Sequence, residues 1–325
     1  MPKNDHPARP LKPARLAPGD TIGLIAPASA PPDPKAIDRS VRVLESLGFK
    51  VKLAPNVRQR WGFLAGSDRD RAADLMGMFT ARKVNAILCV RGGYGSARLL
   101  PRLDYGIIRA HPKIFIGYSD ITSLHCAFLV KSGLASFHGP MLNSDFIQPN
   151  FPKFTLESFQ RTLTQAGPPG SICQGYRKKT VRILRRGMAA GPLIGGNLCI
   201  LCASLGTQYQ PSFKGAILFF EDLDEVPFRF DRMLTQLLNA GLLQQVAGIA
   251  IGINQNCFDP KAKRGGEYRQ SLEEVFQERL LPLRIPIVSG LPFGHIPHNA
   301  TLPIGLQVRL DGNQGDLQVT EPAVS

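Results

Sequence analysis

Three sets of residues in this sequence could do chemistry together: a serine in a sharp turn, acidic residues after a strand, and histidines in a glycine-rich loop. The serine is Ser119, in the segment Gly117-Tyr118-Ser119-Asp120-Ile121. A serine between a buried strand and a helix projects its hydroxyl with the helix amides behind it, as in the nucleophile elbow. The usual second glycine is absent, because Ile121 takes its place. By itself, the pattern fits a serine that only caps the helix equally well.

A glycine-rich loop, Arg91-Gly92-Gly93-Tyr94-Gly95, follows the apolar run Val84–Val90. Glycines at this point expose backbone amides, which could cradle a phosphate or form an oxyanion hole. The loop lacks the Gly-Lys-Ser/Thr ending of a P-loop and the spacing of a dinucleotide fingerprint. Taken alone, it leaves both uses open.

The acidic residues and the histidines lie in the second half of the chain. Glu221 and Asp222 end the apolar run Ala216–Phe220. Burial of such a pair is costly unless the pair is partnered or used, although an ordinary strand end also fits. His295 and His298 lie three residues apart in a loop of Gly and Pro. A loop fixes no ligand geometry and no carboxylate is adjacent, so we predict no metal site.

The first half of the chain alternates short apolar runs with helical patterns. Strands are expected over 21–25, 49–53, 84–90, 113–118 and 135–137, and helices over 34–47, 69–79, 96–102 and 121–131. This alternation predicts a doubly wound parallel sheet. Four polar or glycine-rich segments follow the strands: 27–32, 91–95, 118–120 and 138–140. Since ligands collect at the carboxyl ends of parallel strands, we expect these segments to meet on one face.

The rest of the chain divides less clearly. Residues 143–190 are rich in Pro, Gly and basic residues, with weak periodicity and one expected helix, Leu156–Thr164. Further strands are expected over 216–220, 246–251, 306–310 and 316–320, with a helix over 232–240. We therefore predict a basic, proline-rich tail over 1–18, a nucleophile domain over 19–150, a linker over 151–190 and a second domain over 191–325.

Composition excludes several classes of protein. The chain is 43% hydrophobic and 20% charged, which is ordinary for a globular protein, and its formal net charge is +14. No helix-turn-helix, zinc finger or aromatic RNA-binding motif accompanies this charge, so we predict no nucleic-acid partner. The basic, proline-rich start has no apolar segment behind it, so we expect no signal peptide, and no apolar run is long enough to cross a bilayer. Six cysteines show no framework spacing. We expect a cytoplasmic protein with no membrane partner.

Seven short segments, taken in order, resemble the LD-carboxypeptidases, also called muramoyltetrapeptide carboxypeptidases. They are the stretch at 19–29, Arg-Gly-Gly-Tyr-Gly at 91–95, Gly-Tyr-Ser-Asp at 117–120, Gly-Gly-Asn-Leu at 195–198, Phe-Phe-Glu-Asp at 219–222, Gly-His at 294–295 and Leu-Pro-Ile-Gly at 302–305. The resemblance runs from about residue 19 to 310. It implies an α/β protein, in which a Rossmann-like doubly wound parallel sheet is followed by a smaller, β-rich C-terminal domain, with the active site between them.

The resemblance also implies an activity and its residues. A serine carboxypeptidase of this kind releases terminal D-alanine from murein tetrapeptides during cell-wall recycling, by cleaving the bond from an L-centre to D-Ala. The implied triad is Ser119, Glu221 and His295, and no metal or other cofactor is expected. The amide of Asp120 would then form the oxyanion hole with that of Gly92 or Gly93.

Tyr94 and His138 are expected to contact the substrate, and His138 could instead build the wall of the site. A homodimer is also expected. The family includes a peptidase that gives immunity to microcin C by cleaving peptidyl-nucleotides, a version associated with a tryptophan from the linker region. The only tryptophan here is Trp61, in the first domain, which favours the murein enzyme. A third alternative is a non-catalytic binder of anionic ligands, using the glycine-rich loop and the basic surface.

Overall fold

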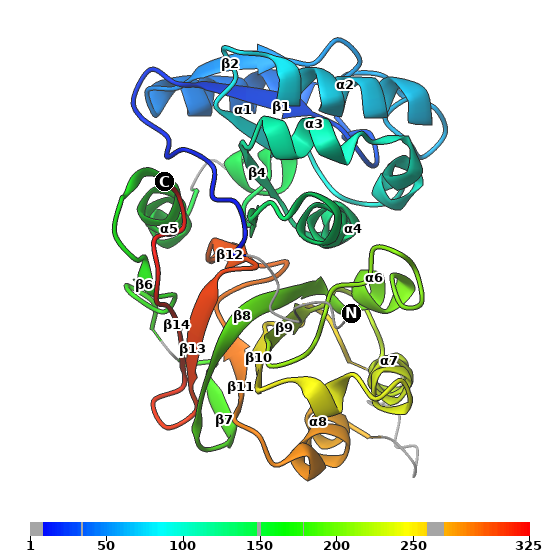
Figure 1. Cartoon of the computed structure of the whole chain (residues 1–325), viewed down its shortest axis with the longest axis vertical. Coiled ribbons are helices and arrows are strands. Elements are labelled where there is room, and N and C mark those ends of the chain that lie inside the picture. The colour runs from blue at the N-terminus through cyan, green and yellow to red at the C-terminus, as the bar shows by residue number, and fades with distance from the viewer. Residues whose placement is uncertain (1–8, 34, 148–150, 178, 259–269) are drawn as a thin grey trace, which may run out of the picture.

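The computed structural model describes residues 9–33, 35–147, 151–177, 179–258 and 270–325. The first eight residues of the predicted tail, the predicted helix start at Pro34, residues 148–150 of the predicted first domain and Lys178 of the basic cluster lie outside the described residues. The chain forms two β-sheets, each with its own helices, which lie one above the other in Figure 1.

The first sheet is the predicted Rossmann-like one. Its strands are β1 (Thr21–Ile25), β2 (Lys50–Leu53), β3 (Ala86–Cys89), β4 (Ile114–Gly117), β5 (Ser136–His138) and β12 (Leu302–Ile304), in the order β12-β5-β4-β3-β1-β2. Strands β1 to β5 are parallel. Every residue of β3 and β4 is buried, as expected for strands covered on both faces. The sequence did not predict β12, which comes from the C-terminal part and pairs antiparallel with β5.

The helices of this half are α1 (Lys35–Ser46), α2 (Asp68–Thr80), the 3-10 helix η1 (Ser96–Arg102), α3 (Tyr105–Ala110) and α4 (Thr122–Ala127). Helix α2 begins one residue before the predicted 69, because the hydroxyl of Ser67 caps it and accepts a hydrogen bond from the Asp70 amide at 3.1 Å. The sequence missed α3, whose cap is Asp104. The chain continues from α4 through a π-helical turn, Phe128–Ser132, which ends at Gly133 with a φ of 66°.

The region predicted as a linker is more ordered than expected. Helix α5 (Lys153–Thr164) begins three residues before the predicted start, and β6 (Gly170–Ser171) and β7 (Arg182–Arg185) follow it. Strand β6 pairs with β14 and β7 with β11, so both belong to the second sheet. These strands were missed because they are very short and carry no alternating apolar pattern.

The second sheet has the order β6-β14-β13-β8-β9-β10-β11-β7. Its parallel centre is β8 (Met188–Asn197), β9 (Ile217–Glu221), β10 (Gly248–Gly252) and β11 (Ile287–Leu291), and its antiparallel side includes β13 (Gln307–Asp311) and β14 (Asp316–Val319). Helices α6 (Leu198–Ala203), α7 (Pro227–Asn239) and α8 (Leu272–Leu280) cover one face (Figure 1). They bury Leu201, Phe230 and Phe276 in one apolar cluster with β9 and β10.

The two halves are joined close to the predicted catalytic residues. At the end of β8, Gly196 has a φ of 144°, and a Cβ there would lie 2.4 Å from the hydroxyl of Thr122 on α4. The same hydroxyl accepts a hydrogen bond from the Asn197 amide at 3.0 Å. Since any larger residue at Gly196 would push the halves apart, this contact fixes the position of one sheet against the other.

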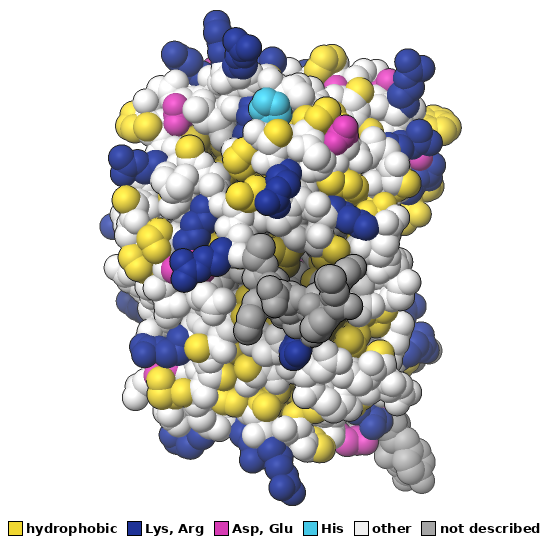
Figure 2. Space-filling model, in the orientation of Figure 1, with side chains coloured by type: hydrophobic (Ala, Val, Ile, Leu, Met, Phe, Trp, Pro, Cys, Tyr) yellow, Lys and Arg dark blue, Asp and Glu magenta, His cyan; other side chains and the backbone are white. Residues whose placement is uncertain are grey.

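The basic surface is dispersed on the face shown in Figure 2. Lys and Arg side chains there are spread over both halves, with hydrophobic side chains between them, and do not gather into one stripe. No helix among the described residues combines the length and the apolar character that a membrane span requires.

Candidate active site

Ser119 lies at a strained turn between β4 and α4. Its φ is 63°, in the left-handed region, and Tyr118 before it is extended. A helix-capping serine has extended dihedrals and accepts a hydrogen bond from a helix amide. Ser119 does neither, because no side chain caps η2 (Ser119–Ile121) or α4. The geometry therefore matches a nucleophile elbow and not a simple cap.

The missing second glycine of the elbow has a structural explanation. Strand β4 and the following helix approach each other at Gly117, where a Cβ would lie 2.9 Å from the Cγ2 of Ile121. The close strand–helix approach thus requires a glycine at the first position. The side chain of Ile121 fills the space that this glycine leaves.

The glycine-rich loop lies directly against Ser119. A Cβ on Gly92 would be 2.9 Å from the Cβ of Ser119 and 3.2 Å from both its hydroxyl oxygen and the Asp120 nitrogen. Gly93 has a φ of 99°, and a Cβ there would meet the hydroxyl of Ser29 at 2.6 Å. Three of the four segments expected at the strand ends therefore meet around this serine. The fourth also joins them, because the Gly139 amide donates to the Gly117 carbonyl at 3.2 Å.

A buried arginine that the sequence analysis missed holds two of these segments in place. Arg71, on α2, is only 1% exposed and donates hydrogen bonds to the carbonyls of Pro27 and Gly95. Asp120 holds the loop from the other side, since its carboxylate accepts from the Ser96 amide at 2.8 Å. Burial raises the pKa of Asp120 in spite of this bond. No sequence signal marks Arg71, because charged residues on a helix are normally exposed.

Glu221 and His295 form a close hydrogen-bonded pair across the site. The Nδ1 of His295 lies 2.6 Å from the Oε2 of Glu221, which is fully buried at the end of β9. Gly294 permits this approach, since a Cβ there would be 3.1 Å from Glu221. Burial lowers the pKa of His295, but the charge of Glu221 and its hydrogen bond outweigh burial, so the net shift is upward.

Asp222, the second acid of the pair, has a different environment. Its carboxylate accepts from the side-chain amide of Asn197 at 2.8 Å and from the Cys199 amide at 2.9 Å. Burial raises the pKa of Asp222 to about 6. It therefore stabilises the turn between β8 and α6, while Glu221 contacts the histidine. Across the described ranges, no three His, Cys, Asp or Glu residues cluster closely enough to hold a metal ion.

The other histidines are placed differently from His295. His138 is fully buried, and neither of its ring nitrogens has a hydrogen-bond partner among the described residues. Burial holds its pKa well below the usual range. The ring of Tyr118 packs against both His138 and His295, with its centroid 5.7 Å from that of His138 and 4.9 Å from that of His295. Ser119 and His295, both described, share no hydrogen bond, and His298 is exposed.

Tyr94 lies at the surface beside the glycine-rich loop. Its amide donates to the hydroxyl of Ser29 at 3.1 Å, and its side chain is 53% exposed. The ring packs edge-on against Phe63, with the centroids 5.4 Å apart. Trp61, two residues before Phe63, is also exposed.

Comparison with known proteins agrees with this geometry. Residues 22–139 match the LD-carboxypeptidase N-terminal domain and residues 190–310 match the LD-carboxypeptidase C-terminal domain. The chain belongs to the LD-carboxypeptidase family. The predicted family is thus confirmed, and the protein is a serine-type hydrolase, a carboxypeptidase. This family membership speaks against a non-catalytic binder.

Individual relatives of this LD-carboxypeptidase cover nearly its whole length. It is 39% identical over 300 residues, 92% of this chain and 91% of the relative, to the probable murein peptide carboxypeptidase of Bacillus subtilis. A solved muramoyltetrapeptide carboxypeptidase from Oxalobacter formigenes has a TM-score of 0.79 at 33% identity, covering 92% of this chain and 97% of that one. The solved microcin C7 self-immunity protein MccF has a TM-score of 0.86 at 29% identity, covering 97% and 100%. The predicted two-part α/β fold is confirmed by these structures.

Proposed function

We propose that this LD-carboxypeptidase releases terminal D-alanine from murein tetrapeptides by cleaving the bond between an L-centre and D-Ala. One observation carries the proposal: a buried carboxylate, Glu221, pairs at 2.6 Å with His295, on a loop near the strained turn of Ser119. The names of the relatives from Bacillus subtilis and Oxalobacter formigenes support murein peptides as the substrate class.

In the proposed mechanism, the hydroxyl of Ser119 attacks the scissile carbonyl while the Nε2 of His295 takes its proton. Glu221 accepts a hydrogen bond from Nδ1, which orients the ring and stabilises the imidazolium. His295 then gives the proton to the leaving amine of D-alanine, and an ester on Ser119 remains. Water, activated by the same histidine, hydrolyses that ester. The upward pKa shift of His295 supports this scheme, because it reflects a carboxylate that favours the charged ring.

The oxyanion of this reaction would be held by the Asp120 amide together with that of Gly92 or Gly93. The position of Gly92 supports this assignment, because its backbone lies so close to Ser119 that no side chain fits there. One such donor is typically worth about 2.7–4 kcal/mol of barrier. Two residues were expected to contact the substrate. Tyr94 is exposed at the surface, where a substrate could reach it. His138 is fully buried, which supports its alternative role in building the wall.

The second candidate function is cleavage of a peptidyl-nucleotide linkage. The likeness to MccF, with a TM-score of 0.86, favours it, and one solved MccF structure is a complex with adenosine monophosphate. The predicted linker, residues 151–190, contains no tryptophan, and its one tyrosine is Tyr176. Murein peptides are proposed as the substrate because of the names of the relatives. The first assay should therefore test a murein tetrapeptide and a peptidyl-nucleotide side by side.

We also propose that the enzyme works in the cytoplasm. Five of the cysteines are free thiols, which supports a reducing compartment; they are Cys89, Cys126, Cys199, Cys202 and Cys257. The homodimer expected from the sequence stays a prediction, which light scattering on the purified chain would test.

The deciding experiment incubates the purified protein with murein tetrapeptide and measures the released D-alanine. The matched control is Ser119→Ala, which should release none above background. A parallel reaction contains a peptidyl-adenylate analogue. Release of D-alanine by the wild type alone supports the proposal, and cleavage of the nucleotide conjugate alone would replace it with the second candidate.

A further inference from the structure

A buried aspartate near the catalytic histidine takes no part in the mechanism above. Asp145 lies on the π-helical turn η4 (Leu142–Phe146), which follows β5. This turn is tied to the end of β3, because the Asn143 amide donates to the Val90 carbonyl at 2.8 Å. Asp145 is only 6% exposed. A carboxylate is costly to bury unless it is partnered, so its contacts indicate what it does.

The contacts of Asp145 reach the residue directly before the nucleophile. Its carboxylate accepts a hydrogen bond from the Met141 amide at 2.8 Å and another from the hydroxyl of Tyr118. Ser144 hydrogen-bonds with both groups. Burial and the charge of Asp145 hold the pKa of Tyr118 well above its usual range, so the hydroxyl stays protonated and donates. Asp145 therefore holds the tip of the Tyr118 side chain.

Tyr118 connects this carboxylate to the general base. Its ring packs edge-on against the imidazole of His295, with the centroids 4.9 Å apart and an angle of 69° between the planes. Tyr118 is 3% exposed, so packing fixes its sides while the hydrogen bond fixes its tip. In the described part of the chain, Ser119 and His295 share no hydrogen bond. The direction in which the imidazole turns therefore decides whether its Nε2 reaches the serine.

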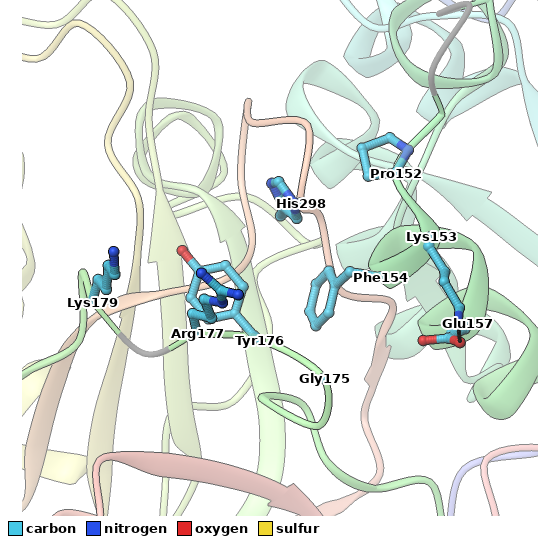
Figure 3. Close-up of a pocket in the computed structure, with 9 residues that line it drawn as sticks. All are labelled: Pro152, Lys153, Phe154, Glu157, Gly175, Tyr176, Arg177, Lys179 and His298. Atoms are coloured by element: carbon cyan, nitrogen blue, oxygen red, sulfur yellow. Dashed lines mark ion pairs between the residues drawn. The ribbon is translucent and has the colours of Figure 1, made fainter.

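The other histidine of the same loop has different surroundings. The ring of His298 lies 6.0 Å from the rings of Phe154 and Tyr176, and it helps to line a cavity of about 680 Å³ (Figure 3). Neither the tyrosine before the nucleophile nor the buried aspartate lines this cavity. Of the two histidines of the loop, their contacts therefore concern His295.

Three carboxylates act on His295 from different parts of the fold. Glu221 is hydrogen-bonded to its Nδ1 at 2.6 Å, Asp222 follows Glu221 in the chain, and Asp145 comes from η4 in the other half. Burial lowers the pKa of His295, and the charges of these three groups raise it, that of Glu221 most. The influence is mutual, because burial raises the pKa of Asp145 to about 6 and the charge of His295 opposes this rise.

The remaining titratable groups around Tyr118 do not replace Asp145. The ring of His138 packs against it at 5.7 Å, but burial holds the pKa of His138 well below the usual range, so this ring is neutral. The charge of Arg91 also acts on Tyr118, while its guanidinium donates to the Ala30 carbonyl at 3.3 Å. Asp145 is thus a negative charge near the base that one substitution removes without changing Glu221.

We propose that Asp145 is a second carboxylate of the active site, a positioning residue that holds Tyr118 against His295 and stabilises the imidazole when it is protonated. In the proposed mechanism, His295 gains a proton as Ser119 attacks, and a fixed negative charge nearby favours that state. This inference rests on the proposed function and goes beyond it, because it gives the histidine of the second half a partner in the first.

The direct test is an NMR titration of the His295 imidazole in the full-length protein without substrate, with His295→Ala to identify its resonances. Asp145→Asn keeps the size of the side chain and its acceptor oxygen but removes the charge. It should lower the pKa of His295 by about half a unit to one unit, which corresponds to about a three- to tenfold fall in kcat. The acid limb of kcat/KM should move to lower pH by the same amount, and KM should stay unchanged.

Two further variants separate the charge from packing. Tyr118→Phe keeps the ring and removes the hydroxyl, so kcat should fall about threefold through the lost hydrogen bond. The matched control is Asp74→Asn, because Asp74 is also buried and accepts from the Asn56 amide at 3.1 Å, but does not act on His295. It should leave the pKa of His295 and kcat as in the wild type.

An unchanged pKa of His295 in Asp145→Asn would overturn the proposal even if kcat fell, because the role of Asp145 would then be structural only. Should this variant not fold in thermal unfolding, a wild-type kcat in Tyr118→Phe would overturn the proposal instead. The titration needs no substrate. A wild type that releases no D-alanine would therefore refute the proposed function, while the pKa comparison separately decides whether Asp145 acts on the histidine.

Discussion

The charge of Glu221 should account for a large part of the rate, and Glu221→Gln isolates it. The substitution keeps the size of the side chain and removes only the charge that faces His295. With about 4 Å between the charge centres and an effective dielectric of about 20, their attraction is about 4 kcal/mol. If this attraction is available only once the ring is protonated in the transition state, its loss corresponds to about a 10³-fold fall in kcat.

The pH profile gives a second readout of the same change. Burial lowers the pKa of His295, and the charge and hydrogen bond of Glu221 raise it above its ordinary value. The base is inactive when protonated, so activity is lost as pH falls through this pKa. Without the charge of Glu221 the pKa falls, and the acid limb of kcat/KM should move to lower pH.

The assay is steady-state release of D-alanine from murein tetrapeptide across a pH series, with thermal unfolding as a check on the fold. Glu225→Gln is the matched control, because Glu225 lies four residues further along and pairs with Arg229 at 3.3 Å. It should leave both turnover and the acid limb unchanged. Turnover of Glu221→Gln within tenfold of the wild type, or an acid limb that does not move, would refute the assignment of Glu221.

Four further predictions concern the remaining groups of the site. Ser119→Ala should abolish turnover, and an active variant would contradict the role of Ser119 as the nucleophile. Ser119→Gly should also abolish turnover and should raise the free energy of unfolding by up to about 1 kcal/mol, because glycine adopts a φ of 63° without strain. A Gly variant that is less stable than the wild type in chemical denaturation would contradict a strained turn at this position. Gly92→Ala should lower kcat about 10²-fold by crowding Ser119, while the control Gly77→Ala, with nothing within 4 Å, should stay fully active; equal activities would exclude the loop from the oxyanion hole. His295→Ala should lose nearly as much turnover as Ser119→Ala, and His298→Ala should keep its activity on the murein tetrapeptide. A large loss with His298→Ala and a small loss with His295→Ala would make His298 the general base instead. Activity should be indifferent to EDTA, because a triad needs no Lewis acid, and loss that zinc restores would contradict this mechanism.

Local patterns in the sequence predicted the first sheet and the turn at Ser119. Apolar runs such as 84–90 and 113–118 alternate with helical patterns, and the residues that follow them are glycines and polar residues. These signals depend on near neighbours in the chain, so they are readable without a structure. Their convergence on one face then follows from the handedness of parallel sheets.

The linker shows where local patterns fail. Strands β6 and β7 are two and four residues long. Each exists because a strand from a distant part of the chain offers hydrogen bonds to it, β14 in one case and β11 in the other. Strand β12 joins the first sheet for the same reason. Short strands carry too few residues for a periodicity of two to be recognised, so their pairing partners decide whether they form.

The sequence by itself determined which residues could react: a serine in a strand–helix turn, a glycine-rich loop, an acidic pair and a Gly-His loop. The family resemblance already favoured Glu221 and His295, and only the tertiary structure shows what each member of the acidic pair contacts. Glu221 contacts His295 although 74 residues separate them, while Asp222 turns toward Asn197. Adjacent residues at a strand end point to opposite faces of the sheet, so the choice depends on what packs against each face. The burial of Arg71 has the same origin, since two distant loops supply the carbonyls that stabilise its charge.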